Sequence, residues 1–476
     1  MKTAIHMLCF FLFFSITILA AGIEETDVLK FVDPFIGTQN GGNVFPGATR
    51  SHSLAKAVAD VNSYNNQGGN QAGFTLDGSP VIGFSMAHDS GTGSQPSLGN
   101  FPLFSELCPG DNIDNCVWSR TDRMISYDWQ KVEASPGYFA IELDNHIRSR
   151  MTVGQRSALF EFTFPHASPK DPSPYSNASR WQPWPNDKDI IAPLVLLDLD
   201  DLQGSRLYAN ITVDAQTGRM TGNGTFLPSF GAETYIMHFC VNFVSDTAIR
   251  DNGIFVNHRG AAQPKLLSIP RGYQPPAGGW IRFEPDRNSH NETIVTVRMG
   301  LSYVSADQAC HNIHADQDDL NTTHHESAFD ALKAQAGDVW REQLSVITIN
   351  DSSVTSNPML FYSALYRTMI NPQNMTGENP LWFSDEPYFD SLYCIWDTFR
   401  TVFPLYTIFE PDAMTEIIRS LIDTYKHTGY LPDCRMSLCK GYSQGGSNAD
   451  GEYEIDVEML KLTALQSCLP MHTSRT

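Results

Sequence analysis

ETIVTVRMGLSYV (residues 292–304) and ESAFDALKAQAGDVWREQL (residues 326–344) mark a change of secondary structure within the chain. The first segment carries β-branched and other apolar residues in partial alternation with polar ones, which is typical of a strand. In the second segment, apolar side chains recur at helical spacing at Phe329, Leu332, Val339, Trp340 and Leu344. The sequence therefore predicts a β-rich part followed by an α-helical part.

The residues before this change include further strand-like runs. They are GYFAIEL (137–143), LFEFTF (159–164), APLVLLDL (192–199) and TYIMHFCVNF (234–243). Gly, Pro, Asn and Asp separate them, so we expect an antiparallel β-sandwich over residues 22–315.

A linker helix region is predicted over residues 316–350, and a helical domain over residues 351–476. Within that domain, PMLFYSALYRTMI (358–370) and DAMTEIIRSLIDTYKHTG (412–429) are predicted helices. Asp412 is the expected N-cap of the second helix, and Gly429 the residue that ends it.

The N-terminus predicts the compartment. Lys2, the apolar run 7–19 and the small residues that follow are typical of a secretory signal peptide, which we place at residues 1–21. The predicted location is therefore secreted or extracellular. Acceptor tripeptides Asn-X-Ser/Thr fit that location and begin at Asn177, Asn210, Asn223, Asn291, Asn321, Asn350 and Asn374.

Removal of the signal peptide would leave eight cysteines, an even number that an oxidising compartment can pair. Cys108 with Cys116, and Cys434 with Cys439, are the closest in sequence. Spacing alone leaves the pairing open. The net charge of −21 argues against nucleic acid or an anionic membrane as a partner.

Two glycine-rich blocks are the strongest functional signal. They read GTQNGGNVFPGAT (37–49) and HDSGTGSQPSLGNFPLF (88–104). Dense glycines indicate tight backbone that a ligand can approach closely. Their polar residues Asn40, His88 and Asp89, taken with IWDTFRT (395–401), point to an uncharged, hydroxyl-rich ligand such as a sugar.

Each of these motifs has a structural alternative. Asp397 and Arg400 lie three residues apart, so on a helix they could form a surface salt bridge instead of binding sugar hydroxyls beside Trp396. His88 and Asp89 could be an ordinary turn pair in which the aspartate caps the loop.

Two further motifs have weaker support. Gly441-Tyr442-Ser443-Gln444-Gly445 matches the G-x-S-x-G pattern, but no alternation of strand and helix precedes it, which argues against a serine hydrolase. A metal-like cluster has unsuitable spacing for zinc or calcium, so we expect a surface loop there: Cys310, His311, His314, Asp316, Asp318, Asp319, His324, His325 and Glu326.

Several blocks, in this order, resemble the fungal branch of glycoside hydrolase family 92, whose members are secreted exo-α-1,2-mannosidases. They are the first glycine-rich block, AKAVADV, FTLDGSPVIGFSMAHDSGTGSQPSLGNFPLF, ASPGYFAIEL, IWDTFRTVFPL and LPDCRMSLCKGYSQGGSNAD. The resemblance implies an N-terminal β-sandwich, a C-terminal (α/α)6 barrel, and calcium-dependent, inverting hydrolysis of mannose-containing N-glycans. It also implies a mannose pocket lined by Gly41, Gly42, His88, Asp89, Trp396, Asp397 and Arg400.

This sequence departs from that pattern in two places. Arg50-Ser51-His52-Ser53-Leu54 replaces an apolar segment, so we expect the sandwich to be disturbed locally. After GGSNAD no family block follows, and the acid and base carboxylates of the family have no counterpart. Twelve helices need roughly 190 residues, more than lie between 351 and 476. We therefore expect an incomplete barrel and a protein truncated at its C-terminal end.

Three functions are compatible with these observations. The first is an α-mannosidase by descent that lacks its catalytic carboxylates, the second a non-catalytic secreted mannose-binding module, and the third a serine esterase that uses Ser443. The sequence assigns neither catalytic residues nor calcium ligands.

Overall fold

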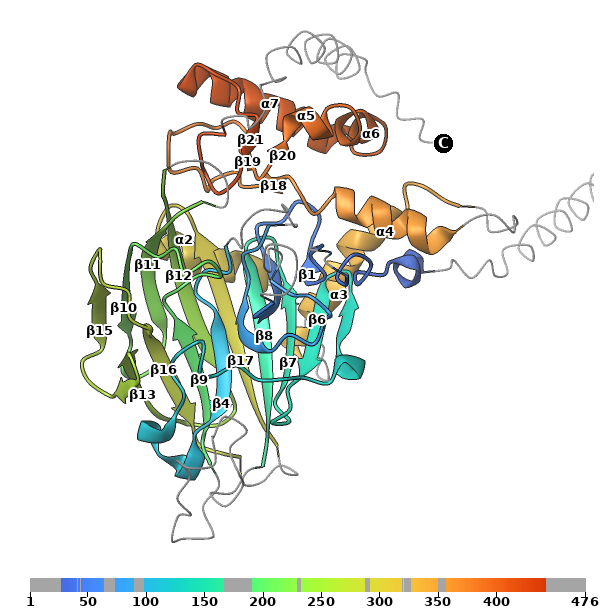
Figure 1. The fold of residues 1–476 in the computed structure, drawn as a ribbon. Coiled ribbons are helices and arrows are strands. Elements are labelled where there is room, and N and C mark those ends of the chain that lie inside the picture. Colours follow the sequence, from blue (N-terminus) through green and yellow to red (C-terminus); the bar gives the residue numbers. More distant parts are fainter. Residues whose placement is uncertain are drawn as a thin grey trace, which may run out of the picture.

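The computed structural model describes residues 27–40, 42, 44–63, 73–89, 98–166, 191–228, 233–286, 292–318, 320, 327–349 and 357–441. The side chains of Tyr393, Trp396 and Asp397 are not among the parts described. Two antiparallel sheets form the N-terminal part, and a mainly helical region follows it (Figure 1). The predicted order, β first and α second, is confirmed.

The first sheet has eight strands, and each hydrogen-bonded pair within it is antiparallel. Its spatial order is β1 (Ala48–Thr49), β2 (Lys56–Val61), β3 (Val81–Ser85), β4 (Leu103–Leu107), β9 (Pro193–Asp198), β16 (Ala277–Phe283), β13 (Ile249–Val256) and β14 (Arg259–Ala261). Strands β2, β3, β9 and β16 are buried on both faces. On the outer side, Trp118 stacks on Phe255 with ring centroids 5.0 Å apart.

The second sheet has nine strands, again with antiparallel pairs. Its order is β15 (Leu266–Ile269), β10 (Tyr208–Val213), β11 (Met220–Phe226), β12 (Tyr235–Val244), β17 (Glu292–Ser302), β8 (Ser157–Pro165), β7 (Arg148–Val153), β6 (Tyr138–Glu142) and β5 (Glu133–Ser135). All five strand-like runs quoted above coincide with strands: β6, β8, β9, β12 and β17.

Strand alternation builds the core between the sheets. In β8, Phe160, Phe162 and Phe164 are buried in the core that the sheets share, whereas Leu159 belongs to a cluster on the opposite face. Phe162 meets Phe84 of the first sheet edge-on, with ring centroids 5.5 Å apart. Because side chains alternate between faces with a period of two, one strand contributes to two hydrophobic clusters.

Helices α2 (Ala306–Gln317) and α3 (Ala328–Leu344) cover much of the outer face of the second sheet. A Cβ at Gly300 would lie 2.1 Å from the carbonyl oxygen of Ala309, so glycine is needed for α2 to approach β17 this closely. A disulfide between Cys240 and Cys310 fixes α2 to β12. The prediction of a surface loop from Cys310 onward is therefore wrong for residues 310–317, because they belong to helix α2, which Ser305 caps.

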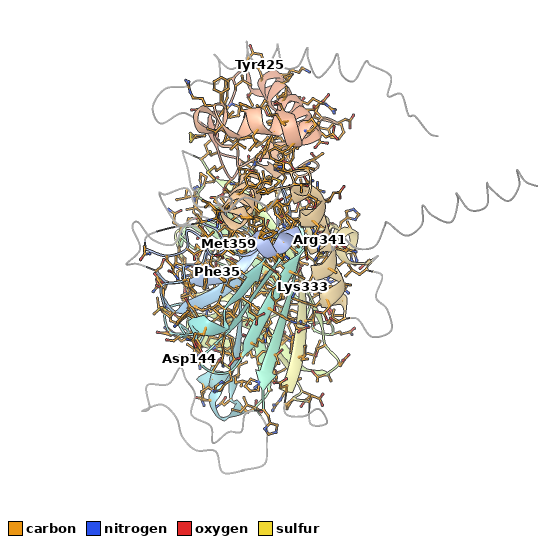
Figure 2. The ribbon with its side chains drawn as sticks, turned by 90° about the vertical axis from the view of Figure 1, so that its right-hand side faces the viewer. Phe35, Asp144, Lys333, Arg341, Met359 and Tyr425 are labelled. Carbon is orange, nitrogen blue, oxygen red and sulfur yellow. A yellow bond between two sulfur atoms is a disulfide. The ribbon has the colours of Figure 1, made fainter. Side chains whose placement is uncertain are left out.

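Helix α3 connects the two parts of the molecule. Its first turns place Phe329 and Leu332 against the sheet, and its last turns place Trp340 and Leu344 in the helical core. Figure 2 shows α3, marked by Lys333 and Arg341, running beside the strands. The Lys333 ammonium lies 3.5 Å from the centre of the Tyr138 ring. The helix predicted from the apolar spacing of 326–344 is confirmed.

The helical region contains four α-helices among its described residues. They are α4 (Pro358–Thr368), α5 (Ile395–Thr398), α6 (Val402–Phe409) and α7 (Pro411–Thr428). Two small ladders accompany them, β18 (Gln373–Asn374) with β19 (Phe389–Asp390), and β20 (Tyr393–Cys394) with β21 (Cys434–Arg435). Short 3-10 helices lie in the N-terminal part: η1 (Val28–Phe31), η2 (Pro109–Asp111), η3 (Ile113–Asn115) and η4 (Trp129–Lys131).

Both predicted helices of this region are present, but one cap differs. Asp412 is not the N-cap of α7, because Pro411 occupies the first helical position and Glu410 precedes it as the cap. Gly429 ends α7 with φ +81°, as expected. Four described helices do not test the predicted (α/α)6 arrangement, which stays a prediction. The predicted signal peptide, residues 1–21, and residues 442–476 lie outside the described part.

Disulfide pairing differs in part from the nearest-neighbour candidates. Cys108 is bonded to Cys116, but Cys434 is bonded to Cys394 rather than to Cys439. Because β20 and β21 are hydrogen-bonded neighbours, their paired cysteines stand opposite one another. The Cys439 thiol is buried and is not part of a described disulfide.

Candidate functional site

The first glycine-rich block forms a tight turn. The amide of Gly42 donates to the Gln39 carbonyl over 2.9 Å, and Asn40 is exposed with φ +55°. A Cβ at Gly42 would lie 2.1 Å from the Gly37 carbonyl oxygen, so the turn requires glycine there. Gly41 lies outside the described residues.

His88 is fully buried beside this block. Its Nδ1 lies 2.6 Å from the Lys56 carbonyl, which only accepts hydrogen bonds, so Nδ1 carries a proton. Its Nε2 lies 2.8 Å from Asp60 Oδ1 and 3.0 Å from Ser85 Oγ. These contacts hold the ring in the sandwich, and contact between His88 and a sugar stays a prediction.

Ser85, His88 and Asp60 have the composition of a catalytic triad but not its geometry. In a triad the serine and the aspartate contact opposite ring nitrogens. Here both contact Nε2, and all three side chains are buried. This group therefore does not activate Ser85 as a nucleophile. Ser443, the serine of the G-x-S-x-G pattern, lies outside the described residues.

Asp89, the residue after His88, is fully buried and lies close to Lys56. Burial lowers the pKa of Lys56 to about 7, and the charge of Asp89 partly opposes that shift. A nearby carboxylate favours the charged form of an ammonium group that burial has removed from water. Asp89, at the start of the second glycine-rich block, and Lys56 thus interact electrostatically in a buried environment.

A second group of polar side chains meets Asp89 at the junction of the two parts of the molecule. We call this group the seam; it consists of Asp89, Tyr235, Tyr303, Tyr388 and Asp390. All five side chains are buried. Burial raises the pKa of Tyr303 well above its usual value, and the nearby Asp390 and Asp89 raise it further. Tyr303 therefore lies within electrostatic reach of both carboxylates, one from each part of the molecule.

Asp390 is anchored from the helical side. The amide of Ser391 donates to its Oδ1 over 2.7 Å, and the Arg435 guanidinium lies 3.2 Å from its Oδ2. Strand β20 and helix α5 begin a few residues after Asp390, and α5 carries the first four residues of IWDTFRT. The second glycine-rich block and the segment that leads into IWDTFRT thus approach the same tyrosine.

Helix α5 is a single turn, held by the Cys394–Cys434 disulfide and by the Ile395 amide, which donates to the Asp433 carbonyl over 2.9 Å. Arg400 is exposed, with its guanidinium 5.9 Å from the centre of the Phe399 ring. The side chains of Trp396 and Asp397 lie outside the described part. The proposed roles of these three residues stay predictions.

Two buried carboxylates that sequence reasoning missed join the parts of the molecule. Glu378, from the loop after β18, accepts hydrogen bonds from Ser302 Oγ at 2.6 Å, the Tyr303 amide at 3.0 Å and Asn312 Nδ2 at 2.7 Å. These donors belong to the end of β17 and to α2. No local pattern marks Glu378, because its partners are more than 60 residues away in sequence.

Glu410 also contacts the sandwich. His52 Nε2 lies 3.0 Å from Glu410 Oε2, and His52 Nδ1 lies 2.7 Å from the Pro372 carbonyl. The His52 amide also donates to the Met369 carbonyl. Within residues 50–54, where a local disturbance is expected, residues 52–54 are buried and His52 contacts the helical region. The disturbance itself stays a prediction.

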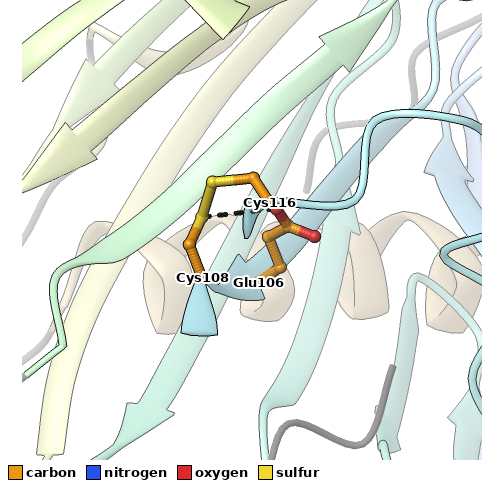
Figure 3. A group of neighbouring side chains, drawn as sticks. All are labelled: Glu106, Cys108 and Cys116. Carbon is orange, nitrogen blue, oxygen red and sulfur yellow. Dashed lines mark hydrogen bonds between the residues drawn. A yellow bond between two sulfur atoms is a disulfide. The ribbon is translucent and has the colours of Figure 1, made fainter. Parts of the chain in front are cut away.

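One group of metal-ligating side chains lies close together among the described residues. Glu106, Cys108 and Cys116 bring their ligand atoms within 4.8 Å of one another (Figure 3). Cys108 and Cys116 are disulfide-bonded. A disulfide sulfur has neither the negative charge of a thiolate, which binds metals, nor the proton of a thiol. The 3.4 Å contact from Cys108 Sγ to Glu106 Oε1 is therefore a packing contact.

The metal-like cluster of the sequence is dispersed. Cys310 is disulfide-bonded, and Asp316 accepts from the Arg156 amide and from Ser157 Oγ. His314 is paired with Asp318 on the surface. Asp319, His324, His325 and Glu326 lie outside the described residues.

Comparison with known proteins identifies the family. The model of the glycosyl hydrolase family 92 N-terminal domain matches residues 31–302, and the model of its catalytic domain matches residues 308–453. A protein of the fungus Arthroderma benhamiae, described as an uncharacterized secreted glycosidase, is 44% identical over 430 residues, which are 90% of this chain and 49% of the relative.

Solved structures share the fold. A family GH92 α-mannosidase from Bacteroides thetaiotaomicron, in complex with mannoimidazole, superimposes with a TM-score of 0.68 at 19% identity over 88% of this chain and 51% of its own. A family GH92 inverting mannosidase from the same bacterium gives 0.69 at 17% identity, covering 92% and 53%. The chain spans about half the length of each of these relatives. With its two domain models matched in order over most of its residues, the chain belongs to glycosyl hydrolase family 92.

Proposed function

We propose that this protein is secreted and binds the terminal mannose of α-linked glycans beside the seam, as the sugar-binding part of an inverting exo-α-mannosidase. The observation that carries the proposal is that two buried carboxylates, Asp89 of the sandwich and Asp390 of the helical region, both lie within electrostatic reach of Tyr303. It brings the glycine-rich block of the sandwich close to the segment that leads into Trp396, Asp397 and Arg400. An aromatic face and charged hydrogen-bonding groups together suit a hexose.

Family membership supports the substrate class. The two bacterial structures are described as mannosidases, and the fungal relative as a secreted glycosidase. Preference for α-1,2 linkages, and completion of the helical region as an (α/α)6 barrel, are parts of the same proposal. Among the residues that the structure describes, no helix combines the length and apolar character needed to cross a bilayer.

Turnover by this protein is a separate question. Inverting hydrolysis needs an acid and a base carboxylate about 6.5 to 9.5 Å apart, with water between them. The blocks shared with the family supply no such pair, so we expect binding without release of mannose. Calcium dependence is part of the same proposal; calcium takes six to eight oxygen ligands, and none is assigned to it.

Calorimetry tests the binding. The purified protein is titrated with α-1,2-mannobiose, with calcium and then with a chelator. Trp396→Ala and Arg400→Ala are expected to weaken binding about tenfold or more, which corresponds to about 1.4 kcal/mol. Trp129→Ala and Arg419→Ala are matched controls, since Trp129 is an exposed residue of the sandwich and Arg419 forms an exposed ion pair with Glu386.

Two results would contradict parts of this proposal. Absence of heat at millimolar disaccharide, with and without calcium, would exclude the sugar site. Free mannose released by the unmodified protein would contradict only the expectation that it lacks turnover.

A further inference from the structure

Two N-glycosylation acceptor sequences face each other on the second sheet. Asn210-Ile211-Thr212 lies on β10 and Asn223-Gly224-Thr225 on β11, and the register pairs Asn210 directly with Asn223. Ala209 and Ile211, the strand neighbours of Asn210, are fully buried in the core, and Gly222 and Gly224, the strand neighbours of Asn223, are also buried. Because side chains alternate along a strand, both asparagines point away from the core.

This part of the outer face lies at the edge of the sheet. Helix α2 packs over β8, β17 and β12 and reaches β11, and α3 packs over β6 to β8. Strands β10 and β15 follow as the last two strands of the sheet. The edge strand β15 exposes Leu266, of which 62% is accessible. An exposed edge strand with apolar side chains favours pairing with another polypeptide unless something covers it.

The hydrogen bonds distinguish the two asparagines. Asn210 Nδ2 donates to the Tyr208 hydroxyl over 3.2 Å and to Asn223 Oδ1 over 3.1 Å, so both of its N–H groups are used. Asn223 takes part in this contact through its oxygen. An N-linked sugar replaces one hydrogen on Nδ2, so it would remove a bond at Asn210 and preserve this contact at Asn223.

Two glycans do not fit on the pair. Side chains directly opposite each other on neighbouring antiparallel strands have Cβ atoms only about 4.5–5.5 Å apart. A sugar on each amide would place two bulky rings over the same part of the sheet. One occupied asparagine and one free one is the arrangement that the register allows.

We propose that Asn223 carries an N-linked glycan in the secreted protein, that Asn210 stays unmodified, and that the glycan covers the β15 edge. In the reaction, Nδ2 of Asn223 loses a proton and bonds to the anomeric carbon of an oligosaccharide. The bond between that carbon and its lipid pyrophosphate carrier breaks, and the pyrophosphate leaves with the electron pair. The inference rests on the secretion part of the proposed function and is independent of sugar binding at the seam.

Glycopeptide mass spectrometry of the protein secreted by a eukaryotic host tests this assignment. Trypsin cleaves after Arg219 and separates the two sites, and enzymatic deglycosylation in heavy-oxygen water marks the occupied asparagine. Occupancy is expected at Asn223 and not at Asn210. Thr225→Ala should remove the mass of one glycan from the intact protein, whereas Thr225→Ser, Thr212→Ala and Thr212→Ser should leave it in place.

Aggregation provides a second measurement. If the glycan covers the edge, Thr225→Ala should form more aggregate on storage than Thr225→Ser, measured by light scattering. A glycan on Asn210, glycans on both sites of one molecule, or an empty Asn223 in a protein glycosylated elsewhere would overturn the proposal. A secreted protein with no glycan at any acceptor would also overturn the proposal, while leaving the calorimetric test of sugar binding unaffected.

Discussion

The buried carboxylate of Glu378 is expected to stabilise the junction between the sandwich and the helical region. It receives three hydrogen bonds, from Ser302, the Tyr303 amide and Asn312, and it is fully buried. Hydrogen bonds to a charged group contribute about 1.5–3 kcal/mol each, and a buried donor without a partner costs about 1–3 kcal/mol. Because these terms overlap, we expect Glu378→Ala to lower the free energy of unfolding by about 4 kcal/mol.

The isosteric change Glu378→Gln separates charge from shape. Glutamine keeps one acceptor, but its NH2 group must face either the Tyr303 amide or Asn312 Nδ2, which are both donors. Asn312 cannot simply turn over, since its Nδ2 also donates to the Leu301 carbonyl over 2.8 Å. Two N–H donors therefore face each other with no acceptor between them. The free energy of unfolding is expected to fall by about 2 kcal/mol.

Urea unfolding followed by tryptophan fluorescence measures these losses. Glu386→Gln is the matched control, because Glu386 forms an exposed ion pair with Arg419 that contributes at most about 1 kcal/mol. If Glu378→Gln unfolds at the same urea concentration as Glu386→Gln, with an unchanged slope, the junction does not depend on this carboxylate and the reasoning fails.

Two further changes probe the folded state. Burial raises the pKa of Glu106 to about 8. The carboxyl group of Glu106 therefore keeps its proton in the folded protein, whereas it releases the proton near pH 4.5 in the unfolded state. The free energy of unfolding should fall as the pH rises from about 4.5 to 8, by on the order of 4 kcal/mol in total from this group. Glu106→Gln should flatten that slope in urea unfolding measured against pH, and an unchanged slope would contradict the assignment. Replacing both Cys394 and Cys434 by alanine opens a loop with a sequence separation of 40 and should lower stability by about 3–4 kcal/mol. The double variant should also expose the α5 backbone to faster hydrogen exchange, and protection equal to that of the parent protein would show that the disulfide is not what holds α5.

Local patterns in the sequence predicted five of the strands and three of the helices among the described residues. Alternating apolar residues gave β6, β8, β9, β12 and β17, and helical spacing gave α3, α4 and α7. These patterns succeed because a strand or helix must bury one face, and that requirement repeats every two or about 3.6 residues. The blocks shared with the family were equally readable, since they are contiguous.

Only the tertiary structure decided which distant residues meet. Glu378 with Asn312, His52 with Glu410, and Cys394 with Cys434 are pairs that no local spacing announces. The approach of Asp89 and Asp390 to Tyr303 belongs to the same class. Such contacts depend on how the sheets and helices pack, because a buried polar group takes its partner from whichever segment the fold brings beside it.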